Sequence, residues 1–168
     1  MSHAHQHRIG VFPGQFDPIT NGHLDILERG MELFDKVIVT VAKNSTKSPL
    51  FNEEERVEMI EEIIKRNKYK NVAVESFDGL LINFARKKKA VALIRGLRAI
   101  SDFEYEFQMA LINRKQNNKI FTVFLMPHER YTYLNSSIVR ELARLHGEFR
   151  TFVPPNVYAR LKKKIKEF

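Results

Sequence analysis

The chain has 168 residues, of which 43% are hydrophobic and 29% charged, and its formal net charge is +8 at pH 7. This length suits one domain with a full core, and the composition excludes a disordered chain and a membrane protein, because no apolar run approaches the roughly 20 residues that span a bilayer. The absence of cysteine excludes disulfides and thiol catalysis, and with no visible secretory signal it makes a cytoplasmic protein the expectation.

Histidine alternates with other residues at the very start of the chain. Such a stretch can hold a divalent metal weakly. We instead expect residues 1–7 to be a disordered leader or a stretch added for expression, and residues 8–168 to form a single domain. Residues 1–7 therefore have no part in the mechanism that the sequence predicts.

The first predicted unit is a strand, a turn and a helix. The apolar run at residues 9–12 is followed by the sequence PGQFDPITNGH at residues 13–23. Apolar residues then recur at steps of three and four from Leu24 to Phe34, which predicts a helix with His23 in its first turn.

The start of that helix is suited to an anion. It offers unpaired N–H groups and the positive end of the helix dipole. Gly14 and Gly22 leave room for a phosphate to approach the backbone, and His23 can donate a hydrogen bond into the same space. For an isolated Gly-His pair, a solvent-facing histidine in an ordinary turn is the alternative.

Strands and helices alternate along the rest of the chain. Further strands are predicted at residues 36–42, 72–75, 90–94 and 120–125, and helices from Asn52, from Asp78-Gly79, from Ser101 to about Asn117, from Ser136 and from Pro155. Residues 101–104 resemble a capping box. The apolar strands lack strict alternation, which is typical of strands buried on both faces of a parallel sheet. We therefore predict an α/β fold, a doubly wound five-stranded parallel sheet with ligands at the carboxyl ends of its strands.

Several candidate functional residues follow these strands, namely His23, Lys47, Arg95, Arg98 and Ser136. Because the carboxyl ends of parallel strands meet at one edge of a sheet, we expect these side chains to converge although they are far apart in the sequence.

Two anion sites are predicted besides the first helix start. Arg95 and Arg98 flank Gly96 just beyond the fourth strand, and their guanidinium forks suit a phosphate clamp, although either alone is equally compatible with a structural salt bridge. After the fifth strand, Asn135 or Ser136 can cap a helix whose hydroxyls and free N–H groups would bind an anion; ordinary helix capping is the alternative.

Familiar nucleotide and hydrolase motifs are absent from the sequence. It contains no P-loop, no G-x-G-x-x-G after the first strand, and no pattern that indicates a Ser–His–Asp or Cys–His site. What is left is a site of anion-binding helix starts and cationic clamps without a covalent nucleophile. Such a site suits phosphoryl or nucleotidyl transfer by positioning and charge stabilisation.

Four segments together resemble the bacterial phosphopantetheine adenylyltransferases, a family of the nucleotidylyltransferase superfamily marked by a T/H-x-G-H motif. They are residues 12–23, LIRGLRA at 93–99, DFEYE at 102–106 and NSSIVR at 135–140, and the resemblance covers about residues 8–160. It implies a Rossmann-like nucleotidylyltransferase fold and adenylyl transfer from ATP to 4′-phosphopantetheine, giving dephospho-CoA and pyrophosphate in coenzyme A biosynthesis. It also implies Mg²⁺ with the ATP, a homohexamer, and coenzyme A as an inhibitor in the same cleft.

The resemblance further implies roles for individual residues. The acceptor phosphate would attack the α-phosphorus of ATP directly and in line, and His23 would stabilise the pentacoordinate transition state. The residues expected to contact phosphopantetheine are Gln15, Lys47, Leu81 and Arg95. Those expected to hold ATP are Gln15, Phe16, His23, Gly96, Leu97, Arg98, Glu106, Tyr131, Thr132, Tyr133, Leu134, Asn135, Ser136 and Ser137. No protein residue is expected to bind the metal.

Two positions depart from the family's pattern. At Gln15 the family usually has Ser or Thr, whose hydroxyl orients the acceptor phosphate; a glutamine amide can donate the same bond but needs more room. Asn135 stands where a serine is common, a milder change because Asn is an equally good helix cap.

Two alternatives to this function stay open on the sequence. A related nucleotidylyltransferase would act on nicotinate mononucleotide or a phosphorylated alcohol, although the RGLR and DFEYE segments favour phosphopantetheine. The basic segments 86–89 and 160–166 are compatible with a nucleic-acid-binding module, but also with solvated helix faces. Because the sequence has no RRM, KH or zinc signature, we expect no nucleic-acid partner, and because no apolar run is long enough to span a bilayer, we expect no membrane partner.

Overall fold

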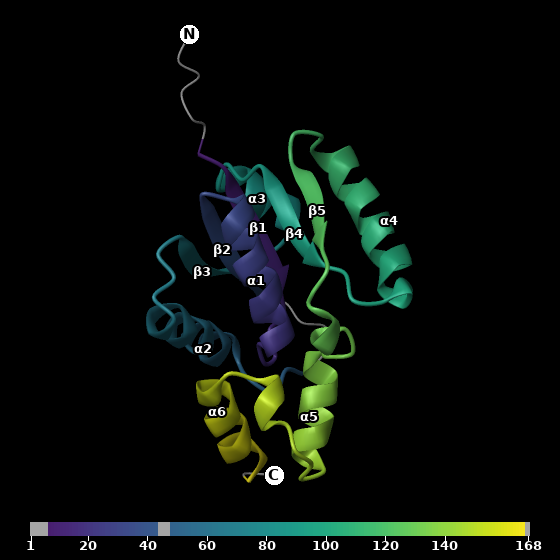
Figure 1. The fold of residues 1–168 in the computed structure, drawn as a ribbon. Coiled ribbons are helices and arrows are strands. Elements are labelled where there is room, and N and C mark those ends of the chain that lie inside the picture. The colour runs from purple at the N-terminus through teal and green to yellow at the C-terminus, as the bar shows by residue number, and fades with distance from the viewer. Residues whose placement is uncertain (1–6, 44–47, 167–168) are drawn as a thin grey trace.

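The computed structural model describes residues 7–43 and 48–166 (Figure 1). Residues 1–6 of the predicted leader lie outside the described residues, and so does Lys47. The strands are β1 (Ile9–Gly14), β2 (Lys36–Ala42), β3 (Val72–Phe77), β4 (Ala92–Gly96) and β5 (Phe121–Leu125). The helices are α1 (Asn21–Leu33), α2 (Glu53–Arg66), α3 (Leu81–Lys87), α4 (Ile100–Gln116), α5 (Ser136–Arg144) and α6 (Pro155–Ile165), with short 3₁₀ turns at Glu129–Tyr131 and Arg150–Phe152.

All five strands form one parallel sheet in the order β3-β2-β1-β4-β5, which confirms the predicted doubly wound architecture. The chain winds outward from β1 to β3, returns to place β4 on the other side of β1, and ends at β5. The strand order therefore reverses between β1 and β4. In open α/β sheets, ligands bind at the carboxyl ends of the strands beside such a reversal.

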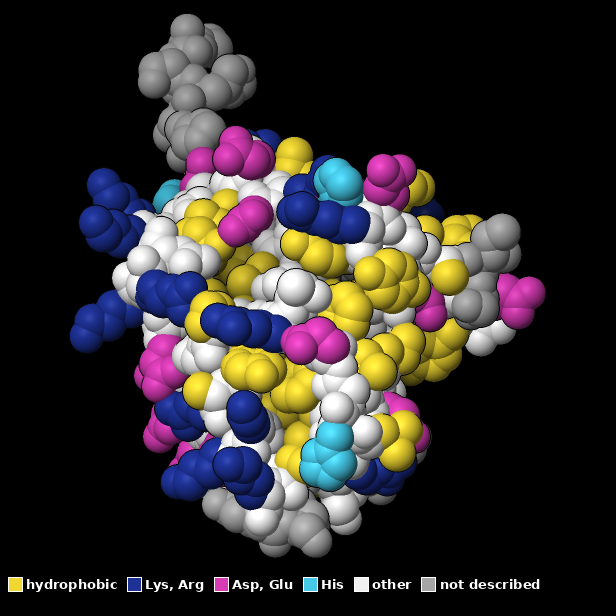
Figure 2. All heavy atoms as spheres, turned by 60° about the horizontal axis from the view of Figure 1, so that its bottom comes forward, with side chains coloured by type: hydrophobic (Ala, Val, Ile, Leu, Met, Phe, Trp, Pro, Cys, Tyr) yellow, Lys and Arg dark blue, Asp and Glu magenta, His cyan; other side chains and the backbone are white. Residues whose placement is uncertain are grey.

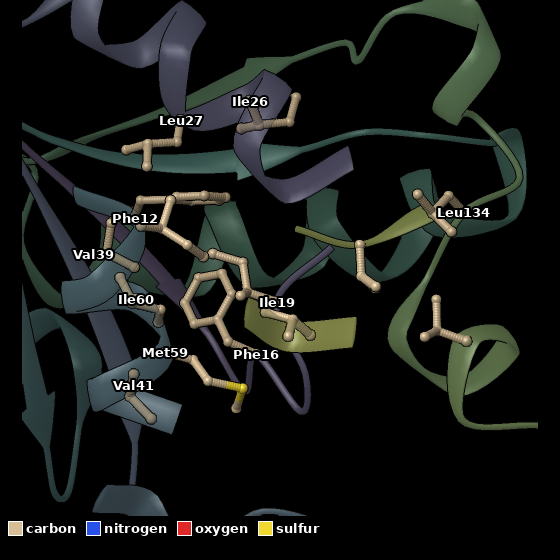
Figure 3. Packing of buried hydrophobic residues seen from close by; sticks show 14 of the residues in the cluster. Phe12, Phe16, Ile19, Ile26, Leu27, Val39, Val41, Met59, Ile60 and Leu134 are labelled. Atoms are coloured by element: carbon tan, nitrogen blue, oxygen red, sulfur yellow. The ribbon is translucent and has the colours of Figure 1, made fainter. Parts of the chain in front are cut away.

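Apolar side chains cover both faces of the sheet. β1 sends Val11 to one face and Phe12 to the other, because successive side chains of a strand alternate. Val11 packs in a cluster with Ile82 of α3, whereas Phe12 packs in a larger cluster with Leu27 of α1 (Figure 3). Helices on opposite faces thus bury the sheet, as the continuous apolar strands predicted.

Side-chain caps begin two helices, α2 and α5, where the sequence predicted them. Asn52 accepts from the N–H of Glu55 at 2.8 Å, and Glu55 accepts from Asn52 in return, which forms a capping box at α2. Asn135, one of the two predicted caps of α5, accepts from the N–H of Ile138 at 2.9 Å. These bonds satisfy N–H groups that the first helical turn leaves free.

The predicted starts of α3 and α4 were wrong. α3 begins at Leu81 rather than at Asp78-Gly79, because Gly79 has a φ of +80° that no right-handed helix contains. α4 begins at Ile100 with the extended residue Ala99 at its N-cap and without a side-chain cap hydrogen bond, so a capping box does not begin this helix.

α4 stands at the β5 edge of the sheet and is set apart from the other helices (Figure 1). Its exposed apolar side chains are Phe103, Tyr105, Phe107, Leu111 and Ile112. A helix that shows apolar residues on several sides is usually buried against another surface. Within the described residues, no helix is both long enough and apolar enough to cross a membrane.

Candidate active site

A cavity of about 620 Å³ opens at the carboxyl ends of β1 and β4, where the strand order reverses. The starts of α1 and α5 and one side of α4 complete its walls. The predicted site residues that line it are Gln15, Phe16, His23, Arg95, Gly96, Arg98, Glu106, Tyr131, Leu134, Asn135, Ser136 and Ser137. The fold thus brings together residues from four separate segments of the chain.

His23 lies in the first turn of α1, where it takes part in a capping box with Thr20. The Nδ1 atom of His23 lies 3.0 Å from the main-chain nitrogen of Thr20, which donates to it, and the Thr20 hydroxyl accepts from the His23 N–H at 3.3 Å. The ring of Phe16 meets the imidazole edge-on, with 5.2 Å between ring centroids. The imidazole is therefore held by its own helix start and by the neighbouring turn.

The surroundings of His23 lower the pKa of its imidazole from 6.5 to about 4. Burial is the largest cause, followed by the positive charge of Arg98 and then that of Arg95. The ring is therefore neutral near pH 7 in the free protein. Since Nδ1 accepts a hydrogen bond, the neutral ring carries its proton on Nε2, which is a hydrogen-bond donor.

Arg95 is fixed by a carboxylate from α4. Its Nε and Nη2 atoms donate to the two carboxylate oxygens of Glu106 at 2.8 and 2.5 Å, and its Nη1 donates to the carbonyl of Pro13 at 3.2 Å. β1 and β4 pair through only two residue pairs, Gly10↔Ala92 and Val11↔Leu93. Arg95 thus joins the two strands beyond the end of their pairing, at the mouth of the site.

Arg98 connects α4 to the segment before α5. Its Nε donates to Asp102 at 3.1 Å, and its Nη1 donates to the carbonyl of Leu134 at 3.2 Å. The sequence offered a phosphate clamp and a structural salt bridge as alternatives for these arginines. Both arginines are in ion pairs, so the salt-bridge interpretation is confirmed, and both line the cavity, where the phosphate clamp stays a prediction.

The start of α5 is tied to the turn after β1. The hydroxyl of Ser136 donates to the carbonyl of Pro18 at 2.8 Å, and Ser137 accepts from Arg140 at 3.2 Å. Capping, the alternative considered for this segment, accounts for the Asn135 side chain. The helix α5 nevertheless begins at the cavity wall, because its first two residues, Ser136 and Ser137, line the cavity.

Four predicted residues do not line this cavity. Leu81 begins α3 on the other side of the sheet, and Leu97, Thr132 and Tyr133 lie beside the site. The main-chain N–H of Leu97 donates to Leu125 at 2.9 Å, and Tyr133 turns toward Phe152. Their predicted contacts with substrate remain predictions, as does that of Lys47, which lies outside the described residues.

Sequence reasoning missed Arg140 and Asp17, both of which line the cavity. Arg140 donates to the main-chain carbonyl of Asp17, and its Nη1 lies 3.5 Å from the Asp17 carboxylate. That buried carboxylate also accepts from the N–H groups of Leu50 and Phe51, both at 2.9 Å. The NSSIVR segment at residues 135–140 contains Arg140, but only the fold shows that the Arg140 side chain meets the turn that follows β1.

Some residues of the two basic segments form ion pairs within the fold, among them Lys88 with Glu75. Arg160 of α6 forms ion pairs with Glu58 and Glu62 of α2, and Lys164 pairs with Glu55 at 2.9 Å. In the view of Figure 2, Lys and Arg side chains are interspersed with acidic and apolar ones over the upper part and lie closer together at the lower left. These ion pairs are those expected of a solvated helix face, and the absence of a nucleic-acid partner stays a prediction.

Comparison with known proteins agrees with this geometry. A family model described as cytidylyltransferase-like matches residues 11–142. A phosphopantetheine adenylyltransferase from Alkaliphilus metalliredigens is 52% identical over 157 residues, which cover 94% of this chain and 99% of that protein. One from Caldanaerobacter subterraneus subsp. tengcongensis is 51% identical, with 95% and 99% of the two chains covered.

Solved structures share the fold at low sequence identity. A bifunctional NMN adenylyltransferase/ADP ribose pyrophosphatase from Francisella tularensis matches with a TM-score of 0.73 and 17% identity, covering 96% of this chain and 50% of that one. A nicotinic acid mononucleotide adenylyltransferase from Plasmodium falciparum matches with a TM-score of 0.65 and 14% identity, covering 96% of both chains. These likenesses support the Rossmann-like fold, and the high identity to the curated relatives decides the family. The chain belongs to the phosphopantetheine adenylyltransferase family.

Proposed function

We propose that this protein transfers the adenylyl group of ATP to 4′-phosphopantetheine, forming dephospho-CoA and pyrophosphate. The observation that carries this proposal is the convergence of His23, Arg95 and Arg98 on one cavity at the reversal of strand order, in a chain about half identical to relatives named for this reaction. Two guanidinium groups and a neutral imidazole donor suit a site that holds two phosphorylated substrates.

The reaction needs no general base. The phosphate of the acceptor is already anionic near pH 7, so one of its oxygens attacks the α-phosphorus directly. A new P–O bond forms at the α-phosphorus as its bond to the departing pyrophosphate breaks, and negative charge grows on the oxygens of the α-phosphate of the transferred adenylyl group. The Nε2–H of His23 would donate to one of these oxygens and stabilise the transition state more than the bound ATP.

Each of the two arginines would bind a different substrate. Arg95, held by Glu106, would bind the acceptor phosphate, and Arg98, held by Asp102, would bind the phosphates of ATP. Gln15 is exposed at the cavity wall, so its amide can donate to the acceptor phosphate where relatives use a hydroxyl.

Magnesium is the cofactor that we propose. Among the residues that the structure describes, no group of three His, Cys, Asp or Glu side chains is placed to hold a metal. Mg²⁺ commonly keeps several waters and binds through substrate phosphates, which is the mode of binding that we propose here. Mg²⁺ would neutralise charge on the triphosphate and its pyrophosphate product.

We also propose a homo-oligomer in which α4 packs against another copy, with the hexamer that the family resemblance implies as the expected state. The exposed apolar residues of α4 support this part of the proposal. Binding of coenzyme A in the same cavity and a cytoplasmic location remain predictions.

Pyrophosphate release from Mg-ATP tests the proposed reaction, with 4′-phosphopantetheine as the acceptor and product mass measured. Nicotinate mononucleotide serves as the competing acceptor. We expect dephospho-CoA from phosphopantetheine only. Turnover of nicotinate mononucleotide without turnover of phosphopantetheine would show that the substrate is assigned wrongly.

A further inference from the structure

A buried arginine lies beneath the turn that follows β1. Arg56, in the first turn of α2, is 1% exposed and is the largest fully buried side chain among the described residues. Its Nη1 donates to the main-chain carbonyl of Gln15 at 2.7 Å, and its Nε donates to the carbonyl of Asn52 at 3.2 Å. The guanidinium is therefore held by main-chain oxygens from two segments.

Arg56 differs from the arginines that line the cavity. Arg95, Arg98 and Arg140 each lie within 4.0 Å of a carboxylate. In the part of the chain that the structure describes, no carboxylate lies so close to Arg56. A buried cation that is compensated only by carbonyl groups costs stability, and well-packed apolar side chains of similar size often replace such groups without loss. What the arginine does provide is a pair of donors that tie the start of α2 to the turn after β1.

The bond to Gln15 fixes one peptide group. In a trans peptide the C=O and N–H bonds point in opposite directions, and the only cis peptide bond in the described residues joins Asp17 and Pro18. Because the Gln15 carbonyl faces Arg56, the N–H of Phe16 points away from Arg56. Both Gln15 and Phe16 line the cavity, so this direction leads to the side where phosphates would bind.

The same turn has a conformation that needs support. Phe16 has a φ of 49°, in the left-handed region that residues with a side chain rarely adopt. Its ring is buried and contacts Phe12 and His23 edge-on. A change in the Gln15–Phe16 peptide would therefore move both a main-chain donor and the ring beside His23.

We infer that Arg56 is a positioning residue for adenylyl transfer, which holds the Gln15–Phe16 peptide with the Phe16 N–H directed at the phosphate groups. The charge on the guanidinium strengthens its bond to the carbonyl and polarises that peptide, which makes the N–H a better donor to an anion. This inference rests on the proposed function, because it takes phosphates as the ligands of the cavity.

Two substitutions at Arg56 and one control test this role. Arg56→Met keeps the length of the side chain without donors or charge, and Arg56→Lys keeps the charge but cannot reach both carbonyl groups. Arg66→Met makes the same change at an exposed position at the other end of α2. Thermal unfolding reports whether each variant is folded. Calorimetric titration with magnesium pyrophosphate measures the Kd, and its stoichiometry counts intact sites.

We expect Arg56→Met to weaken pyrophosphate binding about tenfold and Arg56→Lys about threefold, with stoichiometry unchanged, as the loss of one charge-assisted bond implies. Arg66→Met should bind like the unchanged protein. A folded Arg56→Met variant with an unchanged Kd would overturn the inference. If the Arg56→Met variant does not fold, an unchanged Kd for pyrophosphate in Arg56→Lys would overturn the inference instead.

Hydrogen exchange without any ligand separates this inference from the proposed function. The peptide spanning residues 13–17 should exchange faster in both Arg56 variants than in Arg66→Met, while the core strands keep their protection. Equal exchange in all three variants would refute the positioning role. Absence of pyrophosphate binding by the unchanged protein would instead count against the proposed function, and exchange would still decide the role of Arg56.

Discussion

The Nδ1 atom of His23 accepts a hydrogen bond from the main-chain N–H of Thr20 across 3.0 Å. One interaction thus caps α1 and selects the ring tautomer, because an accepting Nδ1 leaves the proton of the neutral ring on Nε2. The lowered pKa of His23 keeps the ring in this form near pH 7. Helix capping and the proposed catalytic role of His23 thus depend on the same two residues.

Replacing His23 by alanine should lower kcat by about 100-fold or more, while the KM for ATP changes little. The reason is that the Nε2–H bond strengthens mainly in the transition state. Steady-state kinetics with both substrates measure the two constants. His146→Asn is a suitable control, since His146 is exposed with a φ of 57° that Asn tolerates. An unchanged kcat in His23→Ala would refute the proposed role.

Stability should depend on pH through His23. The folded pKa is about 4, below the ordinary value of 6.5, so the unfolded chain binds the proton first as the pH falls. The contribution of His23 to the free energy of unfolding is fully present above pH 6.5. It is lost as the pH falls from 6.5 to 4, and it does not change further below pH 4. Its size is no more than about 3 kcal/mol. Denaturant unfolding of the protein and of His23→Gln, which keeps a capping side chain, should diverge between pH 7 and 4.5. Parallel curves would contradict the low pKa.

The Arg95–Glu106 pair should act as a unit on the acceptor. Arg95→Ala is expected to raise the KM for phosphopantetheine about tenfold, because it removes a forked contact to the phosphate. Glu106→Gln should have a smaller effect in the same direction, since it loosens Arg95, and the double variant should resemble Arg95→Ala alone. Arg98→Ala, the matched control, should change mainly the KM for ATP. An effect of Arg95→Ala confined to ATP would mean that the two arginines are assigned in reverse.

Charged residues on the outer face of α4 should disrupt the assembly. Leu111→Glu and Ile112→Glu each place a carboxylate on an exposed apolar surface, where burial against another copy would be costly. Sedimentation velocity is expected to show smaller species than for the unchanged protein. Leu33→Glu makes the same change on α1, at an exposed position outside α4, and should leave the size unaltered. An unchanged size in the α4 variants would exclude this helix from the interface.

Local features could be predicted from the sequence because their causes lie within a few residues. The apolar runs predicted all five strands, and Asn52 and Asn135 cap α2 and α5 through bonds to a residue three positions on. The same local reasoning predicts a start of α3 at Asp78-Gly79, but Gly79 adopts a positive φ and the helix begins at Leu81. Residues 101–104 show that a capping pattern does not by itself begin a helix.

Partners across the fold could not be predicted in this way. The sequence determined an α/β chain with a phosphate-suited turn at His23 and with arginines at the end of the fourth strand (Arg95) and just beyond it (Arg98), because periodicity, capping and turn chemistry act over short distances. Only the tertiary structure decided that Arg95 pairs with Glu106, that Arg140 meets Asp17, and that Arg56 is buried under Gln15. These contacts depend on the strand order and on the crossovers that bring distant segments to one edge of the sheet, which no local pattern of residues encodes.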